Sequence, residues 1–156
     1  DARLRIVGNF STDDASVFRH ASELGLADKV EFLGKRSHLD LIPLFDSASA
    51  LIHPSLEETF GNIFLEAFGR RLPAIGGRES GAVPQVLGDG RYGILCDVTS
   101  ADDMARAILS LHDSSIDRQS LVAAAYDNLI AHYTAEAVAR QYVKLYEKIL
   151  SVYGSK

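Results

Sequence analysis

Two carboxylates on either side of a glycine are the residues best suited to chemistry in this chain. Glu58 and Glu66 lie eight positions apart, and Gly61 stands between them in the segment ETFGNIFLE. Apolar residues at helical spacing after Gly61 predict that a helix begins there, soon after an apolar strand over residues 50–53. A strand, a loop and a helix N-terminus form an anion-binding site in α/β proteins. Carboxylates beside such a site accept hydrogen bonds from hydroxyl groups, so the pattern predicts a ligand that carries both phosphate and sugar.

The elements that would position these carboxylates alternate along the first two thirds of the chain. Short apolar strands are predicted at residues 4–7, 30–33, 50–53, 73–75 and 92–96, and helices at 13–24, 39–45, 61–70 and 83–87. Gly25 is expected to end the first helix, and Ser37 to cap the second. This alternation predicts right-handed βαβ units and a parallel sheet covered on both faces. The predicted fold class is α/β, a Rossmann-like three-layer α/β/α arrangement.

Only helices are predicted after residue 98. Ser100 and Asp103 form a capping pattern, a second helix is expected over residues 121–133, and Thr134 can cap a third. We therefore interpret residues 1–98 as a βα core and residues 99–156 as C-terminal helices of the same domain. The tyrosines of these helices serve helix packing or a surface for another domain or a membrane; they are Tyr133, Tyr142, Tyr146 and Tyr153.

Composition narrows the function classes. The 156 residues are 47% hydrophobic and 24% charged, which fits one globular domain, and the net charge of −5 argues against nucleic-acid binding. The apolar runs are too short to span a bilayer. Cys96 is the single cysteine, so we expect an inert core residue and a reducing, cytoplasmic setting. Because the chain starts within a strand and has no initiator Met, we expect it to be a piece of a longer protein.

Several further residues have two interpretations. His53, at the carboxyl end of a strand beside the predicted site, is either a structural histidine or part of that site. Lys35 and Arg36 follow the second strand and either face a phosphate or a base, or are solvated charges. Residues 88–93 match G-x-G-x-x-G but precede a strand, so they are interpreted as a turn. No two histidines have the spacing of a helical metal site, and no bound metal is expected.

Segments that occur in a fixed order resemble the C-terminal, donor-binding half of GT-B glycosyltransferases of the retaining family 4. The resemblance covers about residues 4–111. The segments that carry it are LRIVG at 4–8, LGL at 24–26 with VEFLG at 30–34, HPS at 53–55, ETFGN at 58–62 with LEA at 65–67, PAI at 73–75 with Gly81, and Gly90 with GIL at 93–95.

The resemblance implies a role for each residue of a nucleotide-sugar site. Glu66 should accept hydrogen bonds from the ribose, and Glu58 from the donor sugar, which makes Glu58 the catalytic candidate. The amides of Phe60, Gly61 and Asn62 would meet the sugar and the diphosphate. The backbone of Leu33, Gly34 and Lys35 would lie against the base. His53 and Gly8 are further candidates.

The resemblance also implies a reaction. The longer protein would transfer a hexose, with retention of configuration and without a cofactor or metal, from a UDP- or GDP-sugar to a glycan or lipid-linked acceptor in polysaccharide biosynthesis. It would be cytoplasmic, with contact to the inner face of the membrane left open. The acceptor domain and the strand with the arginine and lysine that clamp the diphosphate would precede Asp1, so we expect the chain alone to be inactive. The alternatives are a non-catalytic nucleotide-sugar-binding module and a sugar epimerase of GT-B architecture.

Overall fold

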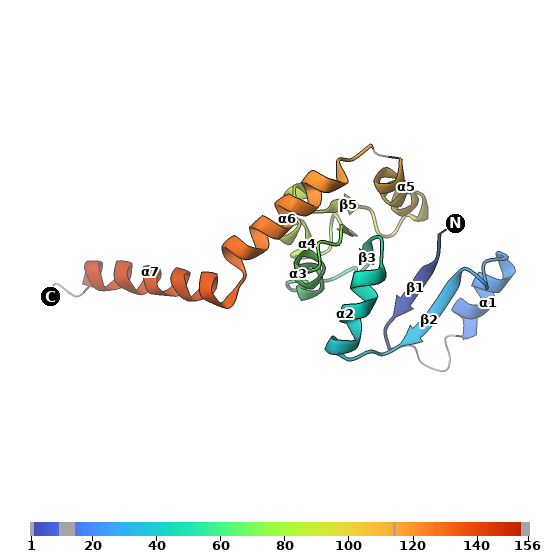
Figure 1. The fold of residues 1–156 in the computed structure, drawn as a ribbon, viewed down its shortest axis with the longest axis horizontal. Helices are drawn as coiled ribbons and strands as arrows, with labels where there is room; N and C mark the ends of the chain where they lie inside the picture. The colour runs from blue at the N-terminus through green and yellow to red at the C-terminus, as the bar shows by residue number, and fades with distance from the viewer. Residues whose placement is uncertain (1, 10–14, 114, 154–156) are drawn as a thin grey trace. The chain divides into compact units, whose positions relative to one another are not determined.

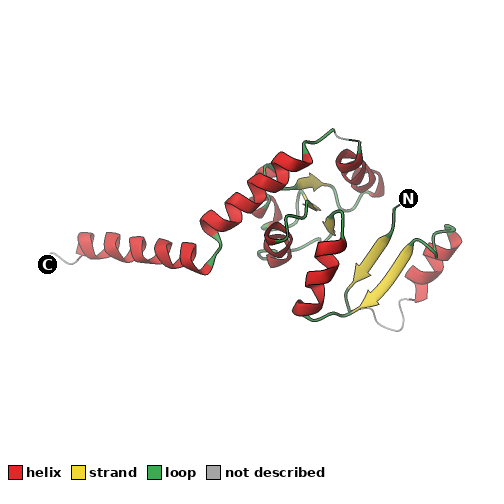
Figure 2. Ribbon diagram, viewed as in Figure 1, coloured by secondary structure: helices red, strands yellow, loops and turns green. Residues whose placement is uncertain are grey.

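A computed structural model describes residues 2–9, 15–113 and 115–153. Within these ranges strands and helices alternate as far as residue 96, and only helices follow (Figures 1 and 2). The predicted α/β class and helical C-terminus are therefore confirmed. The start of the first predicted helix, residues 13–14, lies outside the described residues. The chain divides into two compact units, Asp1–Leu44 and Phe45–Lys156.

The first unit is a βαβ arrangement. Strands β1 (Leu4–Val7) and β2 (Val30–Gly34) are parallel, and α1 (Ala15–Glu23) lies between them in the chain. The Phe18 ring of α1 lies against the Phe32 ring of β2, with centroids 3.9 Å apart. Gly25 follows α1 with φ 68°, which confirms its predicted role in ending the helix.

The first unit has no core of its own. None of the described side chains in residues 2–44 is buried, and Leu4 and Val7 of β1 are 46% and 37% exposed. Within this unit by itself, β1 therefore lacks the cover on both faces that the sequence predicts for the strands. The physical reason is that two strands with one connecting helix provide too little surface to cover both faces.

Helix α2 (His38–Ser47) begins in the first unit and ends in the second. The Ser37 hydroxyl donates to Asp40 Oδ2 at 2.6 Å, and the Asp40 amide donates back to Ser37 Oγ at 3.3 Å. This reciprocal pair confirms the predicted cap. The hydrogen bonds from Ser37 also hold the pKa of Asp40 below its ordinary value. At the other end of α2, Asp46 forms a bidentate ion pair with Arg70, with N–O distances of 2.5 and 2.6 Å.

The second unit contains a separate three-stranded parallel sheet. Its order is β3 (Leu51–His53), β4 (Ala74–Gly77) and β5 (Ile94–Cys96), with His53 opposite Gly76 in the register. Among the described residues these three strands pair with one another, and β1 and β2 of the first unit pair with each other. Chain connectivity predicts strand direction well, but it does not determine which strands pair.

Helices cover both faces of β4. In chain order these helices are α3 (Asn62–Gly69), α4 (Val83–Val86), the 3₁₀ turn η1 (Gly88–Gly90), α5 (Ala101–His112) and α6 (Arg118–His132). Ala74 packs with a cluster from α3, α4 and α6, whereas the next residue, Ile75, packs with Cys96 and Ala107 of α5. Successive strand residues point to opposite faces, so the second unit has the three layers that the sequence predicted.

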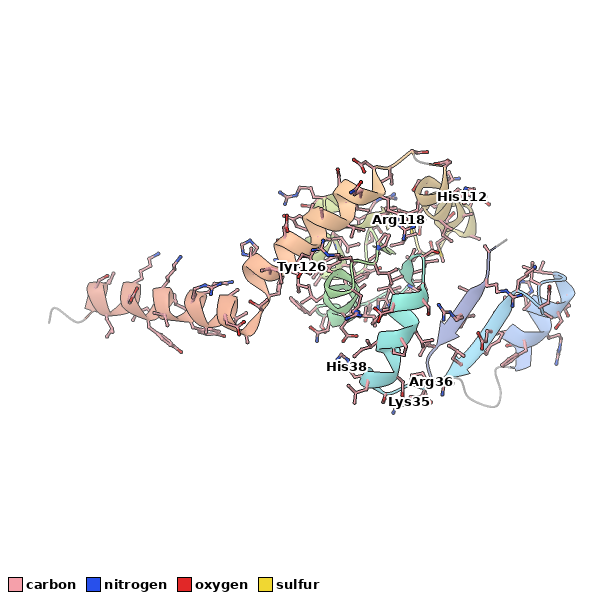
Figure 3. All side chains as sticks on the ribbon, in the orientation of Figure 1. Lys35, Arg36, His38, His112, Arg118 and Tyr126 are labelled. Carbon is pink, nitrogen blue, oxygen red and sulfur yellow. The ribbon has the colours of Figure 1, made fainter. Side chains whose placement is uncertain are left out.

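The predicted caps of the C-terminal helices are also present. Ser100 Oγ accepts the Asp103 amide, and Thr134 Oγ1 accepts the Ala137 amide, each at 3.2 Å. Helix α6 starts earlier than predicted because Asp117 caps it. The Arg71 guanidinium lies 3.8 Å from the ring centroid of Tyr126, which is labelled on α6 in Figure 3.

Helix α7 (Ala135–Tyr153) follows α6, and its residues 138–152 are exposed. Each described helix is too short or too polar to cross a membrane.

Candidate functional site

Glu58 is held in place by three different contacts. Its Oε2 lies 3.1 Å from Nε2 of His53, the last residue of β3. Its Oε1 accepts the Phe60 amide at 3.4 Å, and its backbone carbonyl accepts the Ala82 amide at 2.9 Å. The hydrogen bond from His53, followed by those from the Phe60 and Gly61 amides, holds the pKa of Glu58 below its ordinary value of 4.5. Glu58 is therefore an ionised carboxylate at neutral pH, with a defined orientation.

Two glycines allow the chain to close tightly around Glu58. Gly61 is the N-cap of α3 and has a left-handed backbone, with φ 84° and ψ 51°. Gly81 also has a positive φ of 56°, and a β-carbon there would lie 2.2 Å from the Glu58 carbonyl oxygen. Only glycine adopts such a backbone without strain while leaving room for the neighbouring loop. Both glycines are thus needed for the position of Glu58.

Helix α3 begins without a side-chain cap. No side chain accepts a hydrogen bond from its first amides, and Asn62 at its first position is exposed. The partial positive charge of a helix N-terminus therefore lies next to the Glu58 loop. The arrangement combines a carboxylate, an acceptor of hydroxyl protons, with backbone donors suited to an anion.

Glu66 lies one turn further along α3. The residue is half-buried, and its Oε2 atom is inaccessible to solvent. It follows Leu65 and precedes Ala67, which is fully buried. Glu66 is therefore not a fully solvated surface charge, and its role in binding stays a prediction.

The other predicted residues belong to the first unit. The Gly8 amide donates to the Gly34 carbonyl at 3.2 Å, so these two residues meet at the carboxyl ends of β1 and β2. Leu33 is half-buried, and Lys35 is exposed. Figure 3 labels Lys35 and Arg36 in the turn between β2 and α2.

Residues 1–128 match the model of the family described as Glycosyl transferases group 1. The chain belongs to this family. The match includes every residue predicted for the site. It confirms the family that the sequence motifs indicated.

Two curated relatives show how much of a longer protein the chain represents. It is 30% identical over 152 residues to N-acetyl-alpha-D-glucosaminyl L-malate synthase of Bacillus anthracis, covering 96% of this chain and 38% of that protein. It is 31% identical over 157 residues to D-inositol 3-phosphate glycosyltransferase of Corynebacterium diphtheriae, covering 99% of this chain and 35% of that protein. The chain therefore spans less than two fifths of the length of these relatives.

Solved structures share the fold. Sucrose-phosphate synthase from Thermosynechococcus elongatus aligns with a TM-score of 0.77 and 25% identity, covering 96% of this chain and 39% of that one. Anabaena HepE in complex with UDP aligns with a TM-score of 0.81 and 18% identity, covering 94% and 41%. These likenesses confirm the predicted fold, one half of a GT-B glycosyltransferase.

The sequence did not indicate the loop after β4 that contacts Glu58. The loop that contains Gly81 and Ala82 follows β4 and reaches Glu58 from more than 20 positions away, so no local spacing indicates it. The Phe60 ring lies edge-on to Tyr133, with centroids 5.9 Å apart, a contact that neither predicted role of Tyr133, helix packing or a surface for another domain or a membrane, includes. The one available signal for the loop was Gly81 itself, which was noted only as part of the family pattern.

A separate cavity of about 320 Å³ lies at the carboxyl ends of β4 and β5. It is lined by Leu56, Arg78, Glu79, Ser80, Cys96, Asp97, Val98 and Thr99. No predicted site residue lines it. Two of its charged residues have partners within the protein: Arg78 donates to the Leu95 carbonyl and to Asp103, and Asp97 accepts from Thr99. Burial raises the pKa of the Cys96 thiol, which fits the predicted inert core cysteine.

Proposed function

We propose that the chain is the donor-binding domain of a retaining glycosyltransferase. The complete protein would transfer a hexose from a UDP- or GDP-sugar to a glycan or lipid-linked acceptor. The observation that carries the proposal is the ionised, oriented Glu58 carboxylate beside the uncapped start of α3. Anabaena HepE, which shares the fold, has been solved in complex with UDP and with UDP-glucose, and this supports a nucleotide-sugar ligand.

Glu58 and the start of α3 would recognise different parts of the donor. The Glu58 carboxylate accepts hydrogen bonds from hydroxyls of the transferred sugar, and such charge-assisted bonds are stronger than neutral ones. The amides from Phe60 to Asn62 face the sugar and the diphosphate, whose negative charge is stabilised by the helix N-terminus. The bound nucleotide-sugar would compete with the Glu58 carboxylate for the hydrogen bond that the Phe60 amide donates.

The nucleoside would be bound by residues further from Glu58 in the chain. Glu66 accepts hydrogen bonds from the ribose hydroxyls, and the backbone of Leu33, Gly34 and Lys35 lies against the base, with Gly8 beside Gly34. Retention of configuration, metal-independent transfer and a cytoplasmic location rest on the family resemblance and stay predictions.

We also propose that this chain does not catalyse transfer by itself. Catalysis requires interactions that are stronger in the transition state than in the bound donor. This chain would hold the nucleotide-sugar. The rest of the longer protein would bind the acceptor and would provide the cationic side chains that stabilise the leaving diphosphate.

A titration of the chain with UDP, UDP-glucose, GDP-mannose and ADP-glucose tests the proposal. Amide chemical shifts of residues 53–66 should move in a saturable way for the matching base. Glu58→Gln should weaken UDP- or GDP-sugar binding about 10- to 100-fold, because a hydrogen bond to a charged group contributes about 1.5–3 kcal/mol. The same variant should leave binding of the bare nucleotide almost unchanged.

The chain offers matched variants for this experiment. Glu57→Gln changes the exposed carboxylate next to Glu58 and should have no effect. Glu66→Gln should weaken nucleotide and nucleotide-sugar alike, and this loss should disappear with a 2′,3′-dideoxynucleotide. The proposal is wrong if no donor shifts residues 53–66, or if Glu57→Gln and Glu58→Gln behave alike.

A further inference from the structure

His53 and Glu58 form a hydrogen-bonded pair, and each of the two residues is held in position by further contacts. We propose that His53 is a positioning residue: it donates a hydrogen bond from Nε2 to Glu58 Oε2 and so fixes which carboxylate lone pairs face the donor sugar. The inference rests on the proposed function of Glu58. It assigns His53 a role through Glu58 and not a contact with the nucleotide-sugar.

The first argument is the fixed position of the His53 ring. His53 ends β3 opposite Gly76 of β4, so its backbone is held by the sheet. Its ring meets the Phe64 ring edge-on, with centroids 5.5 Å apart and an interplanar angle of 82°. Phe64 is completely buried, which leaves the imidazole little freedom to rotate.

The second argument is the hydrogen-bond inventory of the carboxylate. An ionised carboxylate only accepts hydrogen bonds, at about four lone-pair positions. Nε2 of His53 at 3.1 Å must therefore be the donor, which requires the Nε2–H tautomer or the imidazolium. The Phe60 amide occupies one position on Oε1. The Gly61 amide also donates to this carboxylate. His53 and the two amides together define the remaining lone pairs, which are the ones available to sugar hydroxyls.

The third argument is partial exposure. The side chains of His53 and Glu58 are 31% and 23% exposed, so Glu58 is accessible to a ligand while its pair with His53 is shielded from much of the solvent. A fully exposed pair would be screened and mobile. Here the pair orients Glu58 before any ligand arrives, which lowers the entropic cost of binding.

Two variants separate the ring of His53 from its hydrogen bond. His53→Phe keeps an aromatic ring against Phe64 but removes the N–H group that donates to Glu58. His53→Gln removes the ring but keeps an N–H group. If His53 acts through Glu58, His53→Phe should raise the pKa of Glu58 toward 4.5 in a carboxyl ¹³C titration and weaken UDP-sugar binding about tenfold relative to UDP. His53→Gln should change both quantities less.

A purely structural role predicts the reverse order, because His53→Gln disturbs packing more than His53→Phe. That order, or an unchanged Glu58 pKa in a folded His53→Phe variant, would overturn the inference. A surface control is His20→Leu, since His20 also neighbours a carboxylate, Glu23 at 4.0 Å. This variant should change neither quantity.

One measurement needs no variant. Imidazole ¹⁵N shifts of the wild-type chain should show a proton on Nε2 of His53 at neutral pH, and the Nδ1–H tautomer would contradict the inference. The Glu58 titration and the tautomer are read without any nucleotide. They distinguish failure of this inference from failure of the proposed function, which would appear as a wild-type chain that binds no donor.

Discussion

The two parallel sheets contain the same kind of hydrogen bond but differ in what covers them. The Leu4 amide of β1 donates to the Lys29 carbonyl at 2.8 Å, and the Leu51 amide of β3 donates to the Pro73 carbonyl at 2.9 Å. None of the described side chains in residues 2–44 is buried, whereas Phe64, Ile75 and Leu87 are at most 1% exposed. Strand pairing therefore does not create a core; helices on both faces of a strand do.

The difference also explains why the position of Glu58 is well defined. Glu58 lies between β3 and α3, in the unit with the close-packed core, and its neighbours are fixed by buried residues such as Phe64. In the first unit, by contrast, none of the described side chains near the carboxyl ends of β1 and β2 is buried. A hydrogen bond to one carboxylate oxygen, such as that between His53 and Glu58, tolerates little displacement of either residue.

Hydrogen exchange should show the largest difference between the units. We expect the Leu4 amide to exchange at least about 100-fold faster than the Leu51 amide, because opening the first unit exposes little apolar surface. The two bonds have nearly equal lengths, so each amide serves as the control for the other. Equal protection would show that the two sheets unfold as one cooperative unit.

Truncation of one phenylalanine in each unit should give the next largest effect. Phe64→Ala should lower the free energy of unfolding by about 3–5 kcal/mol, because it removes a completely buried ring. Phe18→Ala, at a side chain that is 48% exposed, should cost about 1 kcal/mol or less although its ring contacts Phe32. Urea denaturation measures both values, and similar losses would contradict the comparison.

Two glycines with similar positive φ angles, Gly25 and Gly81, separate the cost of backbone strain from the cost of a steric clash. Gly25→Ala places a β-carbon at φ 68° with no atom within 4 Å, so only the strain of about 1–2 kcal/mol should appear. Gly81→Ala adds a clash with the Glu58 carbonyl at 2.2 Å and should cost more. It should also displace the Glu58 amide signal. If the two variants lose the same stability, the loop around Glu58 is more adaptable than its contacts indicate.

The smallest expected effect is a change in the pKa of a single carboxylate. The pKa values of Asp40 and Glu58 are lowered chiefly by hydrogen bonds from Ser37 and His53, so both bonds stabilise the folded chain above the ordinary pKa and are lost as pH falls through the lowered one. Ser37→Ala should raise the pKa of Asp40 alone toward 3.8. Carboxyl ¹³C titration gives both pKa values, and a shift at Glu58 in this variant would reveal coupling between the two sites.

Local signals in the sequence predicted the caps of three helices, whereas the start of α6 was predicted three residues too late. Ser37, Ser100 and Thr134 cap their helices as expected, because a cap depends on residues within three positions of it. The family and the fold were also predictable, since the family motifs occur in a fixed order along the chain and the predicted strands and helices alternate as far as residue 96.

What could not be predicted depends on distant residues. The predicted strands at 4–7 and 73–75 look alike in the sequence, yet the first contains no buried residue and the residues of the second are buried. The difference arises from α3, α4, α5 and α6, which all follow β3 in the chain. In the same way, the support of Glu58 by Ala82 required the position of a loop that only the folded chain brings near.

The state of Cys96 has a practical consequence. The chain contains one cysteine, which is 1% exposed and whose burial raises its thiol pKa, so little reactive thiolate is present at neutral pH. A maleimide dye should therefore modify an introduced surface cysteine and spare the native one. A fluorophore attached at position 57, after Glu57→Cys, would report directly on the loop that contains Glu58 in an otherwise unaltered chain.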